Sequence, residues 1–320
     1  MSAPRVTVAI LSWNRLHYLR ATAESARRCL RHPELEWIIS DNESVEPGLR
    51  DYVSALDWVE HKWFKTQTHA EAMNEIVARA TGKYLLLWPE DVQFVVEGDW
   101  LTRLVSVLEE NPWIGSVGLN FLRRKTNLRL HGSLQTTDIL PILGELRRRP
   151  LGFRYPQTLG SLRTFGWRLP GVIGSGIPSL TRLDHWKILG PWKTRTGTNL
   201  IDSSLGAEDD MIQRFQRSGQ KWQQAALLKP VAADIVNDEL GCKAKVRGGK
   251  RYGRYVPPDG DFYYEVLSED DLPAGESGLP LSFENWVRPV GFRLPLDAGG
   301  NMLKASMNTS VVSEILPATK

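Results

Sequence analysis

Cysteine is scarce in this sequence, and long apolar runs are missing. Two cysteines in 320 residues argue against a disulfide framework and against a cysteine-ligated metal centre. No apolar stretch approaches the roughly 20 residues that span a bilayer. The N-terminus runs into a predicted strand at 6–11 without a secretory hydrophobic region. We therefore expect a cytoplasmic protein, and its small formal net charge of +3 does not by itself indicate nucleic-acid binding.

The glycine motifs of common phosphate-binding folds are also absent. No G-x-G-x-x-G follows the first predicted strand, which argues against dinucleotide binding of the Rossmann type. The sequence also lacks G-x-x-x-x-G-K-[ST], H-E-x-x-H and G-x-S-x-G. A bound phosphate would therefore need a partner other than a glycine-rich loop. A divalent cation held by carboxylates is the obvious substitute.

The first part of the chain alternates predicted strands with predicted helices. Apolar runs bounded by turn residues predict strands at 6–11, 37–40, 58–64, 85–88 and 114–121. Helical spacing of apolar residues predicts helices that begin at Asn14, Thr68 and Trp100. Thr68 and Glu71 have the spacing of a capping box, and Gly82 is a candidate left-handed stop. Repeated β-α-β units indicate an α/β fold with a mostly parallel sheet flanked by helices.

The regular pattern weakens after about residue 120, which suggests how the chain is divided. We expect an α/β domain at 1–235, with its halves at 1–120 and 121–235. Residues 236–320 show little periodicity and read as an irregular C-terminal extension. Its basic stretch 243–254 is either a lid hinged at its two adjacent glycines or a solvated charged loop.

Polar side chains follow three of the predicted strands. They are Ser12, Asn14 and Arg15, then Asp41, then Glu90 and Asp91. The carboxyl ends of parallel strands meet at one edge of a sheet, where ligands bind. Adjacent carboxylates repel one another unless a cation or hydrogen bonds intervene, so Glu90 and Asp91 are candidate ligands of Mn²⁺ or Mg²⁺.

Each of these residues also has a plainer interpretation. One of the two adjacent carboxylates could cap the next turn while the other is solvated. Asp41 could form an ordinary Asx-turn, and Asn14 is equally suitable as a helix cap.

Five segments in order carry a family resemblance. They are "VAILSWNR", "WIISDNES", "AEAMNEIVARATGKYLLLWPEDV", "GSGIPSLTRLDHWKILGPW" and "LGAEDDMIQRFQRSGQKW". Together, over about 5–225, they resemble the inverting glycosyltransferases of the GT-A fold, family 2 type. The resemblance implies a nucleotide-diphosphate sugar as donor, with Asp41 on the nucleotide base and the metal on the diphosphate. It places the following residues at the donor: Ser12, Asn14, Arg15, Asp41, Asn74, Glu90 and Asp91.

An acidic cluster at 208–210 opens a predicted helix and supplies candidates for the catalytic base. An inverting transfer needs a general base that deprotonates the acceptor hydroxyl as it attacks the anomeric carbon. The Glu-Asp pair of the family, matched literally, gives Asp209 as the base. Alignment through Arg214 and Gly219 gives Glu208 instead, and we prefer Asp209.

The sequence departs from the family pattern at several positions. Pro89 stands where the family commonly has the first Asp of its D-x-D motif, and Met73 stands where an Arg is common. All six histidines precede Glu208, so the histidine that often binds the metal beyond the base helix is absent or replaced. Asn237 or Asp238 could substitute for it.

The expected function is transfer of a sugar from a nucleotide donor to an acceptor hydroxyl with inversion. A glycan or lipid-linked sugar is the default acceptor of the family. Basic segments at 122–130, 147–149 and 243–254 keep a modified DNA base open as acceptor, and a protein acceptor is also possible. The alternatives are a catalytically impaired nucleotide-sugar-binding module and a nucleotidyltransferase. A nucleotidyltransferase would normally carry a glycine-rich loop after the first strand, where this sequence has "LSWNRLHYL".

Overall fold

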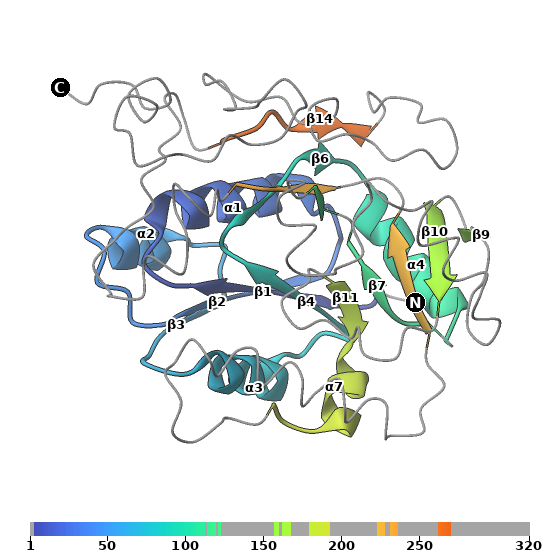
Figure 1. Ribbon diagram of the computed structural model, residues 1–320, viewed down its shortest axis with the longest axis horizontal. Helices are drawn as coiled ribbons and strands as arrows, with labels where there is room; N and C mark the ends of the chain where they lie inside the picture. Colours follow the sequence, from blue (N-terminus) through green and yellow to red (C-terminus); the bar gives the residue numbers. More distant parts are fainter. Residues whose placement is uncertain are drawn as a thin grey trace, which may run out of the picture.

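A nine-stranded sheet forms the centre of the molecule (Figure 1). The computed structural model describes residues 3–112, 114–119, 121–122, 157–159, 162–167, 179–192, 223–227, 231–235 and 262–269. The strand order is β3-β2-β1-β4-β11-β7-β12-β10-β9. The strand bounds are β1 Val6–Ser12, β2 Leu35–Asp41, β3 His61–Phe64, β4 Tyr84–Pro89, β7 Ile114–Gly118, β9 Gln157–Leu159, β10 Leu162–Trp167, β11 Ser179–Arg182 and β12 Gln223–Leu227.

Most strands of this sheet run in one direction. β1 pairs in parallel with β2 and β4, β2 with β3, and β7 with β12. β11 is antiparallel to β4 and β7, and β10 is antiparallel to β12 and β9. Within the described sheet, β10 and β11 therefore oppose the other strands. The predicted α/β class with a mostly parallel sheet is confirmed.

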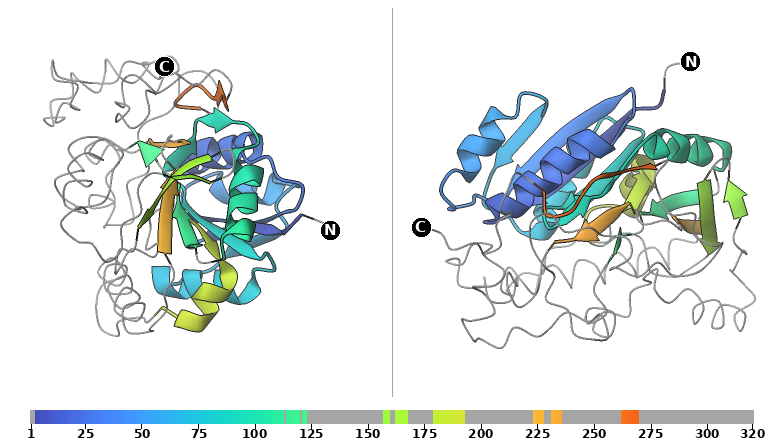
Figure 2. Two further views of the ribbon diagram at one scale, coloured as in Figure 1. Left: turned by 90° about the vertical axis from the view of Figure 1, so that its right-hand side faces the viewer. Right: turned by 90° about the horizontal axis from the view of Figure 1, so that it is seen from above.

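Helices cover both faces of the sheet (Figures 1 and 2). One face packs against α1 (Leu16–Cys29), α2 (Leu49–Ala55) and α4 (Trp100–Glu110). The other face packs against α3 (His69–Arg79) and α7 (Leu183–Leu189). Successive strand residues point to opposite faces, so Val8 joins the first apolar cluster and Ala9 the second. No helix of the described part of the chain is long and apolar enough to cross a membrane.

The predicted helix that begins at Trp100 is confirmed, and so is the capping box of α3. The backbone N–H of Glu71 donates to Thr68 Oγ1 at 3.2 Å, and the N–H of Thr68 donates to Glu71 Oε2 at 2.7 Å. The prediction of Gly82 as a left-handed stop is wrong, because the helix ends with Ala80 as its C-cap at φ −55°. Gly82 instead permits close approach, since a Cβ there would lie 2.5 Å from the backbone nitrogen of Thr7.

The predicted strands have somewhat different ends in the structure; for example, the strand predicted at 58–64 is the shorter β3, His61–Phe64. The run at 114–121 divides into β7 and the separate β8 (Phe121–Leu122), which pairs with β13 (Ala232–Asp234). β13 also pairs with β5 (Val92–Phe94) in the same small sheet. Pro89, one residue beyond the strand predicted at 85–88, is the last residue of β4 and the Cα partner of Leu11. The short α2 was not predicted, because seven residues carry little helical periodicity.

Part of the predicted C-terminal extension lies in the core. β14 (Leu267–Ser268) pairs in parallel with β6 (Val96–Glu97). Tyr263 and Tyr264 are buried in the same apolar cluster as residues of α1, and their backbone N–H groups both donate to Gln93 Oε1. The division at 235/236 stays a prediction, and residues 262–269 are built into the fold of the N-terminal part.

Candidate functional site

The strand order reverses direction next to β1. The chain passes from β1 to β2 and β3 on one side, and then returns to β4 on the other side. Such a switch point, at the carboxyl ends of the strands, is where open α/β sheets bind ligands. The three ends are level, because Ser12 pairs with Asp41 and Leu11 pairs with Pro89. The predicted meeting of these strand ends is therefore observed.

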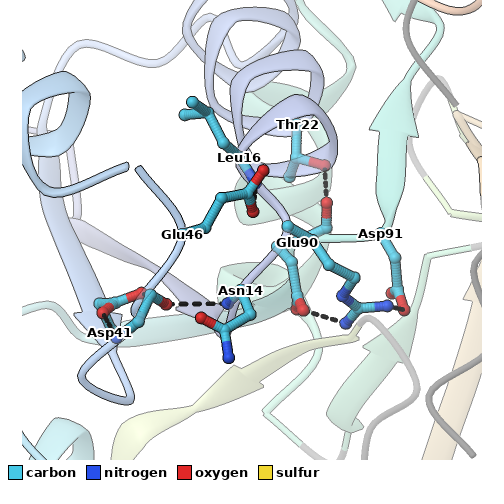
Figure 3. A network of polar contacts seen from close by, with 9 residues as sticks. Asn14, Leu16, Thr22, Asp41, Glu46, Glu90 and Asp91 are labelled. Carbon is cyan, nitrogen blue, oxygen red and sulfur yellow. Dashed lines mark hydrogen bonds and ion pairs between the residues drawn. The ribbon is translucent and has the colours of Figure 1, made fainter. Parts of the chain in front are cut away.

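The turn after β1 is held by the loop after β2. Asn14 has a left-handed backbone, with φ 50°, which Asn tolerates better than most residues. Its N–H donates to Ser44 Oγ at 2.8 Å (Figure 3). Its Oδ1 accepts from the N–H of Val45 at 2.7 Å. The polar side chain of Asn14 thus fixes one loop to the other.

The prediction that Asn14 caps the first helix is wrong. α1 begins at Leu16 with Arg15 at its N-cap, and no N-cap side chain accepts a hydrogen bond. The N–H of Leu16 instead donates to Glu46 Oε2 at 2.8 Å. Glu46 therefore brings a carboxylate from the other loop to the positive end of the helix dipole. Its burial raises its pKa above the usual value, although the Leu16 hydrogen bond and the Arg15 charge act in the opposite direction.

Asp41 is fully buried at the end of β2. Its Oδ1 accepts from the N–H of Ser44 at 2.7 Å, and its Oδ2 accepts from Ser44 Oγ at 2.6 Å. Burial raises the pKa of Asp41 above its ordinary value, against the lowering effect of these two hydrogen bonds. These contacts organise the loop, as the plainer turn-forming interpretation expects. The role of Asp41 on a nucleotide base stays a prediction.

Glu90 and Asp91 lie side by side on the turn after β4 and share one cation (Figure 3). Arg15 Nη2 donates to Glu90 Oε1, and Arg15 Nη1 donates to Asp91 Oδ2 at 3.0 Å. The side chains of Arg15, Glu90 and Asp91 are 4%, 6% and 12% exposed. Burial alone would lower the pKa of Arg15, but the two carboxylates more than offset it and raise that pKa.

The backbone of this turn is tied to three other elements. The N–H of Glu90 donates to the carbonyl of Leu11 in β1 at 3.1 Å. Thr22 Oγ1, from α1, donates to the carbonyl of Glu90 at 2.7 Å. The N–H of Ile235, directly after β13, donates to the carbonyl of Asp91 at 3.1 Å. The two carboxylates therefore project from a backbone that is fixed on three sides.

Asn74, expected at the donor, is engaged elsewhere in the structure. Its Nδ2 donates to the carbonyl of Trp192 at 2.8 Å, and its Oδ1 accepts from the N–H of Trp192 at 2.7 Å. This pair of hydrogen bonds joins α3 to the segment after α7. The donor-binding role of Asn74 stays a prediction.

The catalytic-base candidates Glu208 and Asp209 lie outside the described residues, as do Asn237 and Asp238. The proposed lid at 243–254 lies outside them as well. Ser12 is described: it is buried, and its carbonyl accepts from the N–H of Asn42 at 2.9 Å. The structure thus unites the donor-side candidates around β1 and leaves the base assignments as predictions.

Sequence reasoning missed the residues that brace these loops. Thr22 and Glu46 were not singled out, because their partners are distant in sequence and no spacing rule connects them. Gln67 is a third example: its N–H donates to Asn42 Oδ1 at 2.8 Å, and its Nε2 donates to Ser40 Oγ at 2.8 Å. Ser44 was visible as part of the polar "DNES" turn, which is the one signal that pointed to a bracing residue.

The chemistry of the adjacent carboxylates fits a divalent cation. Mg²⁺ is commonly bound through one or two carboxylates together with substrate phosphates. Glu90 and Asp91 supply two such groups, and both pair with Arg15. Among the described residues, no group of three or more His, Cys, Asp or Glu could hold a metal ion. The remaining ligands would therefore have to come from a bound substrate, from water or from other parts of the chain.

The fold and site define an α/β protein whose polar strand ends meet at the switch point of a mostly parallel sheet. A family model, glycosyl transferase family 2, matches residues 7–167, which is half of the chain. This protein therefore belongs to glycosyl transferase family 2. The resemblance inferred from the ordered motifs is confirmed.

Individual relatives are more distant. The uncharacterized protein y4gI of Sinorhizobium fredii is 28% identical over 120 residues, which is 36% of this chain and 13% of that protein. TarS of S. aureus in complex with UDP is 12% identical, with a TM-score of 0.47, over 73% of this chain and 61% of that one. The mannosyltransferase PcManGT of Pyrobaculum calidifontis, in complex with GDP-Man and Mn²⁺, is 16% identical, with a TM-score of 0.46, over 78% and 61%. This chain thus spans only part of each relative.

Proposed function

We propose that this protein transfers a sugar, with inversion, from a nucleotide-diphosphate sugar to an acceptor hydroxyl. The observation that carries the proposal is the level meeting of the β1, β2 and β4 ends in a family 2 glycosyltransferase chain. Asp41, Glu90 and Asp91 are all gathered at that edge. The donor is proposed to bind there, with its base toward Asp41 and its diphosphate toward the Glu90–Asp91 turn.

The charge at this edge supports a cation-assisted donor site. Among the described residues, Asp41, Glu46, Glu90 and Asp91 are buried there together with one buried cation, Arg15. A diphosphate would be repelled by such an excess of carboxyl groups unless further positive charge accompanied it. Mn²⁺ or Mg²⁺ on Glu90 and Asp91 would supply that charge to the leaving diphosphate.

The transfer itself needs a second carboxylate on the opposite face of the sugar. The acceptor oxygen forms a bond to the anomeric carbon while the bond from that carbon to the diphosphate oxygen breaks. The hydroxyl proton passes to the base, proposed as Asp209 with Glu208 as the alternative, and the bonding electrons leave with the diphosphate. A glycan or lipid-linked sugar is the proposed acceptor, with a modified DNA base or a protein as the other candidates.

Release of nucleoside diphosphate tests the proposal. The protein is incubated with UDP-, GDP-, dTDP- and CDP-sugars and Mn²⁺, and the freed diphosphate is measured. We expect the native protein to hydrolyse one donor slowly. The Asp91→Asn variant should not hydrolyse it. Binding of a donor with no turnover, for every donor and acceptor offered, would favour the impaired binding module instead.

The base assignment has its own matched pair of variants. Asp209→Asn is expected to abolish transfer while donor affinity, measured by calorimetry, stays unchanged. Glu208→Gln, which removes the neighbouring charge, is the control and should retain transfer. The reverse pattern would move the base to Glu208.

A further inference from the structure

Arg15 occupies the two carboxylates that the sequence assigns to a metal. The guanidinium forms a hydrogen-bonded ion pair with each of them, and all three side chains are nearly excluded from water. A guanidinium presents its N–H groups in a rigid fork, which allows one arginine to serve both carboxylates at once. Charge-assisted hydrogen bonds of this kind are roughly twice as strong as neutral ones.

The backbone that carries these three side chains is held in place by hydrogen bonds. Arg15 directly precedes α1, and its carbonyl accepts the first helical hydrogen bond from Leu19 at 2.9 Å. Its guanidinium also lies 5.7 Å from the ring of Tyr18, one turn along the same helix. The Glu90–Asp91 turn is tied to β1, α1 and the residue after β13, as described above. The cluster is therefore a built feature of the resting fold.

We propose that Arg15 is the resident counter-cation of Glu90 and Asp91, and that a divalent cation reaches these carboxylates only by displacing it. A cation and a guanidinium compete for the same oxygen atoms, so the affinity for free Mn²⁺ is set by the strength of the arginine pairs. The protein without donor then binds Mn²⁺ weakly. This inference concerns metal binding by the protein alone, and it holds whether or not the proposed transfer reaction occurs.

Competition of this kind has a functional consequence. Because Arg15 and a divalent cation compete for the same carboxylate oxygen atoms, the binding of one opposes the binding of the other. A site held by its own arginine is therefore protected from loading with free metal ions. Removing the guanidinium takes its positive charge away from two adjacent buried carboxylates. Their mutual repulsion then favours the binding of another cation.

The test measures the affinity for Mn²⁺ alone, by calorimetry or by the electron paramagnetic resonance of free Mn²⁺. Arg15→Gln is expected to bind Mn²⁺ about tenfold or more tightly than the native protein, the change expected when one hydrogen bond between charged groups no longer competes. Adding Asp91→Asn to that variant should remove the gain and so locate the ion. Arg28→Gln is the matched control. Arg28 lies on α1, away from the site, and pairs with Glu97 of β6. This variant should bind Mn²⁺ as the native protein does.

Equal affinity of the native protein and Arg15→Gln would overturn the inference, as would a gain that survives Asp91→Asn. Circular dichroism and thermal unfolding check that each variant is folded. If Arg15→Gln does not fold, Arg15→Lys tests the inference in its place. Lysine keeps the positive charge but lacks the forked N–H groups that bind both carboxylates. We expect Arg15→Lys to bind Mn²⁺ more tightly than the native protein, and unchanged affinity would contradict the proposal.

Discussion

Asn14 sits in a left-handed conformation at the turn that leads from β1 into α1. A residue with a Cβ and no local hydrogen bond pays about 1–2 kcal/mol for this conformation, whereas glycine adopts it freely. The side chain of Asn14 is held by the N–H of Val45, which explains why this residue tolerates the strain. Strained residues of this kind gather at functional sites, in agreement with the placement of Asn14.

Two substitutions separate the strain at Asn14 from its hydrogen bond. Asn14→Ala and Asn14→Gly both lose the contact with Val45, but only alanine keeps the steric cost. We expect Asn14→Ala to be less stable than Asn14→Gly by about 1 kcal/mol in urea unfolding. Equal stability of the two variants would mean that φ at this position relaxes.

His185 makes the stability of the protein depend on pH. Burial is the main cause that lowers its pKa to about 3, with the nearby Arg182 charge adding to the effect. Between pH 6.5 and 3 the unfolded chain is protonated at this residue and the folded chain is not, so stability falls as the pH falls. From pH 7 to pH 5 this residue alone should cost about 2 kcal/mol.

Urea unfolding at the two pH values measures this dependence. Phenylalanine does not titrate, so in His185→Phe the loss of stability between pH 7 and pH 5 should be smaller by about 2 kcal/mol. This comparison does not depend on how stable the variant is at pH 7. An unchanged difference between the two pH values would show that His185 is protonated in the fold or solvated.

Among the elements, the connection between α3 and β4 depends on one glycine. A Cβ at Gly82 would lie 2.5 Å from the backbone nitrogen of Thr7, 2.7 Å from its Oγ1 and 2.8 Å from the carbonyl oxygen of Tyr84. Gly82→Ala should therefore destabilise the protein by about 2 kcal/mol, within the range for overpacking. Thr81→Ala, at the adjacent position, is the control in thermal unfolding and should be milder. A Gly82→Ala variant as stable as Thr81→Ala would show that the connection moves freely.

One buried amide, that of Gln93, binds the backbone of the C-terminal segment 262–269 at two adjacent residues. Gln93 accepts from the N–H groups of Tyr263 and Tyr264 and donates to the carbonyl of Tyr264 at 2.7 Å. Gln93→Leu leaves these backbone groups unpaired, at about 1–3 kcal/mol for each buried group. We expect a loss of at least about 3 kcal/mol and faster hydrogen exchange at both tyrosine amides. Ser268→Ala, at an exposed position of the same segment, keeps the Gln93 contacts and should leave hydrogen exchange at both tyrosine amides unchanged.

The elements that could be predicted are those with strong local patterns. The apolar runs of β1, β2 and β4 and the capping box of α3 are signals carried by neighbouring residues, and the structure confirms them. The pairing of Arg15 with Glu90 and Asp91 joins residues about 75 positions apart, and no local pattern encodes it. Tyr263 and Gln93, which are joined by a hydrogen bond, are separated by 170 positions in the sequence.

At the scale of the whole molecule, the sheet order brings distant segments to one edge. β1 lies between β2 and β4, so the loops that carry Arg15, Asp41 and Glu90 are neighbours in space. The sequence predicted that these strand ends would meet, because parallel strands with helical crossovers leave few alternatives. It placed Arg15 at this edge but did not predict its ion pairs with Glu90 and Asp91, the carboxylates expected to bind a metal.

The central claim is that a nucleotide sugar binds across the ends of β1, β2 and β4. The most direct test is a crystal structure of the protein soaked with Mn²⁺ and the best ligand from a thermal-shift screen of UDP, GDP, dTDP and CDP. The account predicts a nucleotide at that edge, with its diphosphate beside the turn of Glu90 and Asp91. A nucleotide bound at the opposite end of the sheet, or on a surface remote from these residues, would contradict it.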